Sequence, residues 1–302
     1  MFLPDGAHGT IASIEEDLPR APRRVIDHSG SVYSFIPFPV IKPLVINSAV
    51  CYVLAFLLTT VLHEFGHAIV GSVLGSSPVL HHNYVAHLDR ASLPVMDQVW
   101  IALAGPLVSF AQGLLLLPVV RRRRGGGLFD LFLLWCMLLG FGNFLGYLMT
   151  GPIFTAGDIG KVHLLLQVPM LVRIGIALVG AAALAWVAYF STRPFLQFAP
   201  QPSLVEGPSS RMMFNFRIII LPWLIGSVVV TLLYLPVVAI VSIIYPITSG
   251  MVFIFPWKHA RRVEDAEAHG SASLLGPSWA WYGALALAVL VFRLVLAPGI
   301  EL

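Results

Sequence analysis

Two histidines and one glutamate interrupt an apolar stretch of the sequence. They are His63, Glu64 and His67, in the segment VLHEFGHAIV at 61–70. The residues before them, LVINSAVCYVLAFLLTT at 44–60, are almost entirely apolar. An acidic side chain at the centre of a membrane helix costs about 2.5–3.5 kcal/mol on insertion scales. Such groups in such a place therefore indicate a function.

The spacing of the two histidines is typical of a zinc site on a helix. Residues four apart share one face of an α-helix, so the imidazoles of His63 and His67 project side by side and can bind one metal ion. Glu64 follows the first histidine, where it can take a proton from a water bound to the metal. The pattern predicts metal-assisted hydrolysis with a single Zn²⁺ in each chain and Glu64 as the general base.

The third metal ligand must come from elsewhere in the chain, because a catalytic zinc usually has three protein ligands and one open position. The candidates are His81, His82, His87, Asp158 and His163. If the apolar segments cross the membrane in turn, Asp158 emerges on the same side as the end of the first helix, and it is our leading candidate. Asp89 and Asp97 remain alternatives, whereas Asp130 falls on the opposite side.

The composition of the chain is that of a membrane protein. Of its 302 residues, 58% are hydrophobic and only 11% are charged, whereas soluble domains have about 25% charged residues. Cys51 and Cys136 both lie in apolar segments, which predicts free thiols and no disulfide framework. No basic stripe interleaved with aromatic residues is present, so we expect no nucleic-acid partner.

Apolar runs long enough to cross roughly 30 Å of hydrocarbon recur along the chain. They lie at about 45–74, 97–119, 127–150, 170–191, 217–245 and 278–297. We therefore predict an all-α polytopic membrane protein with about six transmembrane helices. The polar connection at 75–96 predicts a short membrane-associated β-hairpin between the first two helices.

These runs divide the chain into regions. Residues 1–44 form a polar N-terminal segment, and 45–191 form a catalytic membrane core with four helices. A linker rich in proline and serine follows at 192–216, and a C-terminal transmembrane pair occupies 217–302. The arginine tetrad at 121–124 dominates the distribution of basic residues, which predicts a cytoplasmic N-terminus in a multi-pass protein and places the histidine cluster nearer the opposite face.

At these positions the sequence resembles the site-2 protease family of intramembrane zinc metalloproteases. The resemblance rests on HEFGH at 63–67, on LAGPL at 103–107 and on an aspartate after the third helix, and it covers about residues 45–165. It implies a zinc endopeptidase that cleaves transmembrane segments of membrane-protein substrates within the lipid bilayer. It also implies that Asp158 is the third zinc ligand, that Glu64 is catalytic, and that the hairpin receives substrate as an added strand.

The family commonly writes its distal motif as Asn-x-x-Pro-x-Pro-x-x-Asp-Gly, and this chain departs from it. Asn143 lies fifteen residues before Asp158, and Ile159 stands in the place of the last glycine. The Asn143 amide can hold a substrate carbonyl or an oxyanion. It can equally form a hydrogen bond between helices, worth about 0.6 kcal/mol on average in a membrane.

Two other functions fit a membrane protein with clustered histidines. A membrane di-iron oxygenase or desaturase would need further metal ligands, for which only the pair at 81–82 is a signal. A non-catalytic metal-binding membrane protein, such as a scaffold or transporter, would keep the site without the reaction. Metal content separates the first alternative from a protease, and a Glu64 variant that retains its metal separates the second. The expected partners are a transmembrane protein substrate and the lipid bilayer, and the sequence leaves a regulatory partner open.

Overall fold

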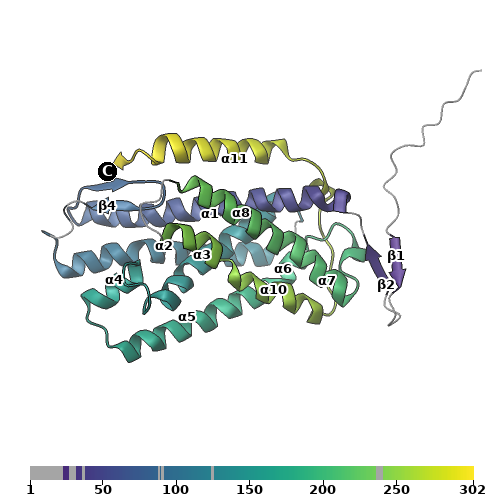
Figure 1. Cartoon of the computed structure of the whole chain (residues 1–302), viewed down its shortest axis with the longest axis horizontal. Helices are drawn as coiled ribbons and strands as arrows, with labels where there is room; N and C mark the ends of the chain where they lie inside the picture. The colour runs from purple at the N-terminus through teal and green to yellow at the C-terminus, as the bar shows by residue number, and fades with distance from the viewer. Residues whose placement is uncertain are drawn as a thin grey trace, which may run out of the picture.

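Apolar helices dominate the structure, a computed structural model that describes residues 23–26, 32–35, 38–87, 89, 92–123, 126–235 and 241–302. Six helical segments are long and apolar enough to span a membrane (Figure 1). They are Lys42–Val73, Val95–Arg122, Leu128–Thr150, Met170–Leu196, Pro208–Leu233 and Trp279–Leu296. The predicted fold class, an all-α multi-pass membrane protein, is thereby confirmed. Much of the predicted N-terminal segment, chiefly residues 1–22, lies outside the described residues.

The first three spans pack together and form the core. They are α1 (Phe38–Val73), α2 (Val95–Arg122) and α3 (Leu128–Thr150). Trp135 of α3 is fully buried, donates its indole N–H to Ser48 of α1, and packs edge-on against Tyr52 at 5.1 Å between ring centroids. In α1 and α3, 72% and 67% of the most apolar part of the span is buried inside the protein. In α5 (Met170–Phe190) and α11 (Trp279–Val291), most of the corresponding part is exposed. The α1–α3 pair is therefore the centre of the bundle, and α5 and α11 present apolar surface of the kind that faces lipid.

The fifth span ends earlier than the apolar run in the sequence. The helical segment stops at Leu233, and a separate helix, α9 (Val241–Thr248), packs back against α8 (Leu221–Leu233). The Ser227 hydroxyl of α8 donates to the Pro246 carbonyl of α9 at 2.7 Å, so the chain has reversed direction between them. Pro236 accounts for the early end, because the residue before a proline is disfavoured in the helical conformation.

A small sheet follows the first span. Strands β3 (Pro78–Leu80) and β4 (Val85–His87) form the predicted antiparallel hairpin. An unpredicted third strand, β5 (Ile300–Glu301), pairs antiparallel with the other edge of β3, so the order is β4-β3-β5. A separate pair of short strands, β1 (Arg23–Ile26) and β2 (Val32–Phe35), precedes α1.

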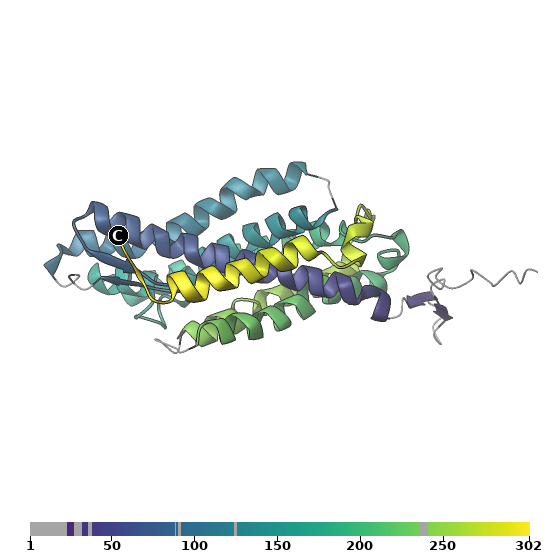
Figure 2. The same cartoon turned by 90° about the horizontal axis from the view of Figure 1, so that it is seen from above.

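The last span lies alongside the first. Figures 1 and 2 both show α11 running beside α1 and ending next to the hairpin. The Asn47 side chain of α1 connects them, since its amide donates to the carbonyls of Leu274 and Gly276 and its oxygen accepts from the Tyr282 hydroxyl.

Short helical pieces connect the longer helices. Those before the fifth span are α4 (Asp158–Leu165), α6 (Thr192–Leu196), η2 (Pro202–Leu204), α7 (Pro208–Asn215) and η3 (Phe216–Ile220). Those after it are η4 (Met251–Phe253), α10 (Ile254–His259), η5 (Ala260–Arg262), η6 (Ala272–Leu275) and η7 (Phe292–Leu296). The region 192–216, expected as a linker, thus contains short helices.

Candidate metal centre

Three side chains from two distant segments meet near the end of α1. His63 and His67 come from α1, and Asp158 is the first residue of α4. The Nε2 atom of His63 lies 3.1 Å from Oδ2 of Asp158 and 3.1 Å from Nε2 of His67. The Nε2 atom of His67 lies 3.3 Å from the same Asp158 oxygen. Among the described residues, these three form the group whose donor atoms converge in the manner of metal ligands.

The separations of these atoms fit a tetrahedral metal site. Ligand atoms at about 2.0–2.1 Å from a zinc ion in tetrahedral geometry would lie roughly 3.3 Å apart, close to the observed 3.1, 3.1 and 3.3 Å. All three atoms can offer a lone pair to a metal ion, and both histidines are buried. Acceptors this close together repel one another unless a cation or shared protons lie between them. The donor set therefore fits a divalent zinc ion.

The α2 backbone fixes the tautomer of His67. Its Nδ1 atom lies 2.6 Å from the carbonyl oxygen of Ile101, and a carbonyl can only accept, so Nδ1 carries the proton. In the neutral ring Nε2 is then left with its lone pair, which is the form that binds a metal. On the other histidine, Nδ1 of His63 lies 3.1 Å from the buried hydroxyl of Ser109. Partners of this kind orient metal ligands in many proteins.

One face of α2 runs along the two histidines. Ile101, Gly105 and Ser109 follow one another at intervals of four residues, so they share a face of the helix. A side chain at Gly105 would overlap Nε2 of His67 and come within 2.7 Å of Nε2 of His63. The glycine therefore keeps open the space in which the donor atoms meet. Gly105 lies within the LAGPL motif, but neither Gly105 nor Ser109 was predicted as a site residue, although their helical spacing from Ile101 was a usable signal.

Close backbone packing brings Asp158 to the histidines. A β-carbon on Gly151, at the end of α3, would lie 2.9 Å from Ile159 of α4, so the absence of one lets α4 pack against that end. Gly160 lies against the Phe154 carbonyl with no room for a side chain. The Asp158 carboxyl is largely but not fully buried, which raises its pKa, but the imidazoles of His67 and His63 outweigh burial and hold that pKa well below its ordinary value. Asp158 is therefore an anion at neutral pH.

Glu64 is buried beside this cluster and interacts electrostatically with all three of its members. Lys161, one turn after Asp158 on α4, contributes positive potential at the carboxyl group of Glu64. Glu64 is adjacent in sequence to His63 but does not belong to the converging donor set.

Aromatic side chains enclose the cluster from α3. The Tyr147 ring stacks on His63, with 5.5 Å between centroids and 12° between planes, and it lies against Tyr245 of α9 at 6.4 Å. Asn143 lies one turn before Tyr147, buried, with an amide oxygen that has no hydrogen-bond partner in the described residues. Asn143 makes no hydrogen bond there to the two histidines or to Asp158. The structure therefore places it beside the site and outside the donor set.

The other candidate ligands from the sequence lie elsewhere. His81 stacks on Tyr84, and the Nδ1 atom of His87 lies 3.0 Å from the Ser76 hydroxyl. The Asp89 carboxylate accepts from that same hydroxyl at 2.6 Å and from a backbone N–H of the hairpin. His82 packs between aromatic rings, and His163 is buried on the far part of α4. Within the described residues, none of them joins the His63–His67–Asp158 group.

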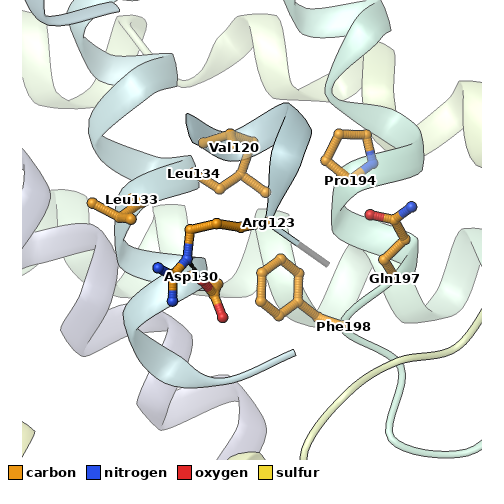
Figure 3. A pocket seen from close by; sticks show the side chains of 8 residues that line it. All are labelled: Val120, Arg123, Asp130, Leu133, Leu134, Pro194, Gln197 and Phe198. Carbon is orange, nitrogen blue, oxygen red and sulfur yellow. Dashed lines mark hydrogen bonds and ion pairs between the residues drawn. The ribbon is translucent and has the colours of Figure 1, made fainter. Parts of the chain in front are cut away.

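A small pocket at the opposite end of α2 carries no comparable chemistry (Figure 3). Its volume is about 20 Å³, room for about one water. Its single acid, Asp130, forms an ion pair with Arg123. Val120, on its wall, is nineteen residues from Ile101, roughly 28 Å along a helix at 1.5 Å per residue. Asp130 thus lies at the end of the bundle away from the histidines, as expected.

Comparisons with models of protein families, with curated proteins and with solved structures found no match to this chain. The resemblance to the site-2 protease family therefore remains an inference from its motifs.

Proposed function

We propose that this protein is a zinc-dependent intramembrane endopeptidase of the site-2 protease type, which cleaves transmembrane segments of membrane-protein substrates. The observation that carries the proposal is the convergence of His63, His67 and Asp158 donor atoms to within 3.3 Å of one another. Two imidazoles and one carboxylate are a common donor set of hydrolytic zinc, which keeps one position open. The buried carboxyl group of Glu64 lies directly beside this set.

In this proposal each residue has a defined task. His63, His67 and Asp158 would hold the ion; the Ile101 carbonyl keeps His67 in the binding tautomer, and the Ser109 hydroxyl orients the ring of His63. Zinc, when bound, supplies a water whose pKa is lowered from 15.7 towards about 7. Glu64 accepts the proton of that water and returns it to the leaving amine. The NH2 group of the Asn143 side chain, which shares a hydrogen bond with Tyr245, is the donor that would contact a substrate carbonyl or the developing oxyanion.

The position of the cluster within the bundle supports a membrane-embedded substrate. Both histidines and Glu64 lie inside the first membrane span, and a soluble peptide would have to enter an apolar bundle to reach them. The basic end of α2 lies away from the cluster. With that end in the cytoplasm, the N-terminus is cytoplasmic and the active site lies towards the opposite face.

The alternatives receive less support from the geometry. A di-iron enzyme needs ligands for two metals, and the described residues contain a donor group for one. A non-catalytic metal site would leave unexplained why a fourth ionisable group, Glu64, is buried beside the three ligands at a considerable desolvation penalty.

Metal content and peptide cleavage, measured together on four purified proteins, test the proposal. We expect about one zinc and no iron in each wild-type chain. Glu64→Gln should retain its zinc and lose cleavage by orders of magnitude, because the amide cannot accept the proton. His67→Ala and Asp158→Ala should lose both zinc and cleavage.

Asp89→Ala and Asp97→Ala are the matched controls, since neither carboxylate belongs to the donor group. They should keep both zinc and activity. Near-normal cleavage by Glu64→Gln would remove the general-base role, and an iron-loaded wild type would point to the oxygenase alternative.

A further inference from the structure

The last span leaves its helical conformation just before it meets the hairpin. After α11 the chain forms one π-helical turn, η7, and then a short turn through Ala297, Pro298 and Gly299. It continues as β5, in which Ile300 lies opposite Leu80 and Glu301 lies opposite Val79. The backbone N–H of Leu302 donates to the Pro78 carbonyl at 3.1 Å. A membrane helix thus unwinds and adds a strand to the sheet.

The junction between helix and strand is closely fitted to the hairpin. Gly299 has a φ of +100°, which favours glycine, and a β-carbon there would lie 2.6 Å from the His81 ring and 2.9 Å from Val79. The Nδ1 atom of His81 lies 3.2 Å from the Ala297 carbonyl. The Ile300 side chain packs against the hydrophobic core. The edge of β3 therefore accepts a helix-breaking glycine followed by an extended aliphatic residue.

This sheet lies next to the candidate metal centre. Gly71, one turn after His67, packs so closely on His87 of β4 that a side chain there would overlap the imidazole ring. On the other side, the Phe292 ring of η7 stacks on Tyr234 at 5.9 Å, and the Tyr234 hydroxyl lies 3.1 Å from that of Thr60. Thr60 is one turn before Glu64. The π-helical end of the last span, which leads into β5, is thus held beside the part of α1 that carries the site.

An intramembrane peptidase needs the arrangement that this segment displays. The peptide bonds of a membrane helix are engaged in intrahelical hydrogen bonds, so a substrate must unwind before water can attack it, and its freed backbone groups then need partners. Addition of the unwound segment to a sheet edge supplies those partners. One edge of β3 is paired with β4, and the other is the one that β5 occupies.

We propose that residues 292–302 are a built-in pseudosubstrate, which occupies the edge of β3 that an unwound substrate segment takes during the reaction. This proposal rests on the proposed function and assigns it a substrate class. The preferred substrate is a membrane helix that ends at a helix-breaking glycine, followed by an extended stretch with an aliphatic residue opposite Leu80. Release of β5 admits the substrate, and re-pairing of β5 closes the site.

A reversible cross-link between the strands tests whether β5 competes with substrate. Val79 and Glu301 are directly opposed, and opposed residues in antiparallel strands have Cα atoms about 4.5–5.5 Å apart, within the range for a disulfide. The double variant Val79→Cys/Glu301→Cys is made in a zinc-loaded Glu64→Gln background, so that binding is measured without hydrolysis. The probe is a fluorescein-labelled synthetic peptide with the sequence of residues 292–302. Its binding to the protein in detergent is measured by fluorescence anisotropy.

We expect the oxidised double variant to bind the peptide at least tenfold more weakly than the reduced one, and reduction to restore binding. Ile300→Pro, which removes a backbone donor of β5, should bind more tightly than its parent. Leu287→Ala, a change at a 63% exposed position of α11 outside this segment, is the matched control and should bind like the parent. Each single-cysteine variant should be insensitive to oxidation, and zinc content reports that the fold is retained.

Equal binding by the oxidised and reduced forms would overturn the pseudosubstrate proposal. A failure of the proposed function is distinguished by repeating the comparison with Glu64 intact. If β5 controls peptide binding but no variant hydrolyses the peptide or a transmembrane substrate, the binding edge stands and the peptidase assignment falls.

Discussion

At the residue scale, the α2 backbone and two small side chains determine what the histidines of α1 can do. The Ile101 carbonyl fixes the proton of His67 on Nδ1, and the Ser109 hydroxyl contacts Nδ1 of His63. Gly105 lies between these two contacts, where any β-carbon would enter the space shared by the donor atoms. The position of the two candidate ligands on α1 thus depends on a neighbouring helix that contributes no side chain to the donor group.

We expect Gly105→Ala to prevent zinc binding while leaving the protein folded. The new methyl group would overlap the Nε2 atoms of His67 and His63, so the imidazoles would have to rotate away from Asp158. The measurement is zinc content by mass spectrometry together with thermal melting in detergent. Gly142→Ala is the control, because nothing lies within 4 Å of its β-carbon position, and it should keep its zinc and gain about 0.5–1 kcal/mol of helix stability. Full zinc occupancy in Gly105→Ala would contradict our view of this glycine.

Ser109 should tune metal affinity through His63. Loss of a side chain that forms a hydrogen bond to a metal ligand typically lowers metal affinity about 10–100-fold. We expect Ser109→Ala to lower zinc affinity by a factor of this order. Competition with a chelator measures the affinity, and the visible spectrum of the cobalt-substituted protein reports a change in ligand geometry. Ser109→Thr keeps the hydroxyl and should restore both. An unchanged affinity and spectrum in Ser109→Ala would show that the 3.1 Å contact has no role in positioning.

At the element scale, a buried histidine of the hairpin packs between the ends of the fifth and last spans. His82 is only 6% exposed, neither ring nitrogen has a hydrogen-bond partner in the described residues, and its ring packs edge-on against Tyr234 and Phe292. Burial, with a smaller contribution from the positive charge of Arg293, lowers the pKa of His82 to about 4. His82 is therefore neutral in the folded protein.

This histidine should make the fold sensitive to acid. In the unfolded chain its pKa is about 6.5, so the unfolded state binds the proton first and the free energy of unfolding falls as the pH drops from about 6.5 to about 4. A phenylalanine at position 82 would fit between the two aromatic rings and has no ring nitrogen to protonate. We therefore expect the acid-induced decrease in the free energy of unfolding to be smaller by roughly 2–3 kcal/mol in His82→Phe than in the wild type. Melting temperatures at pH 7.5 and pH 4.5 measure it. A variant whose acid-induced loss equals that of the wild type would argue against His82.

At the scale of the whole molecule, a single asparagine anchors the last span and its loop to the first. Asn47 is 1% exposed, and its side chain reaches Leu274, Gly276 and Tyr282. These contacts join residues more than two hundred positions apart in the sequence, and they hold the start of α11 while β5 holds its end. The position of the whole C-terminal span thus depends on contacts at two places.

We expect Asn47→Leu to destabilise the molecule by about 1–3 kcal/mol, because it leaves polar groups without partners in an apolar setting. Tyr282→Phe removes one of the three hydrogen bonds and should have a smaller effect, about 0.5–1.5 kcal/mol. Thermal melting and limited proteolysis of the segment 263–278 measure the two changes. An Asn47→Leu protein with the melting temperature and protease resistance of the wild type would show that α11 is held by other contacts.

The sequence by itself determined the features that depend on local pattern. Apolar runs located the six membrane spans to within a few residues at most of their ends, because the thickness of the bilayer and the rise of a helix set their length. The four-residue spacing placed His63 and His67 on one face, and the polar interval after the first span indicated the hairpin, which the structure contains. The overlong fifth run was the exception, because hydropathy alone does not register the break before Pro236.

Only the tertiary structure decided which distant groups meet. The sequence offered several third ligands, and the packing of α4 onto the end of α3 at Gly151 selects Asp158 as the carboxylate beside the histidines. The same holds for the approach of Gly105 and Ser109 to the imidazoles, and for the addition of β5 to β3 across more than two hundred residues. Short-range periodicity carries no information about such pairings, because they depend on how whole helices pack and on where glycine lets two backbones approach.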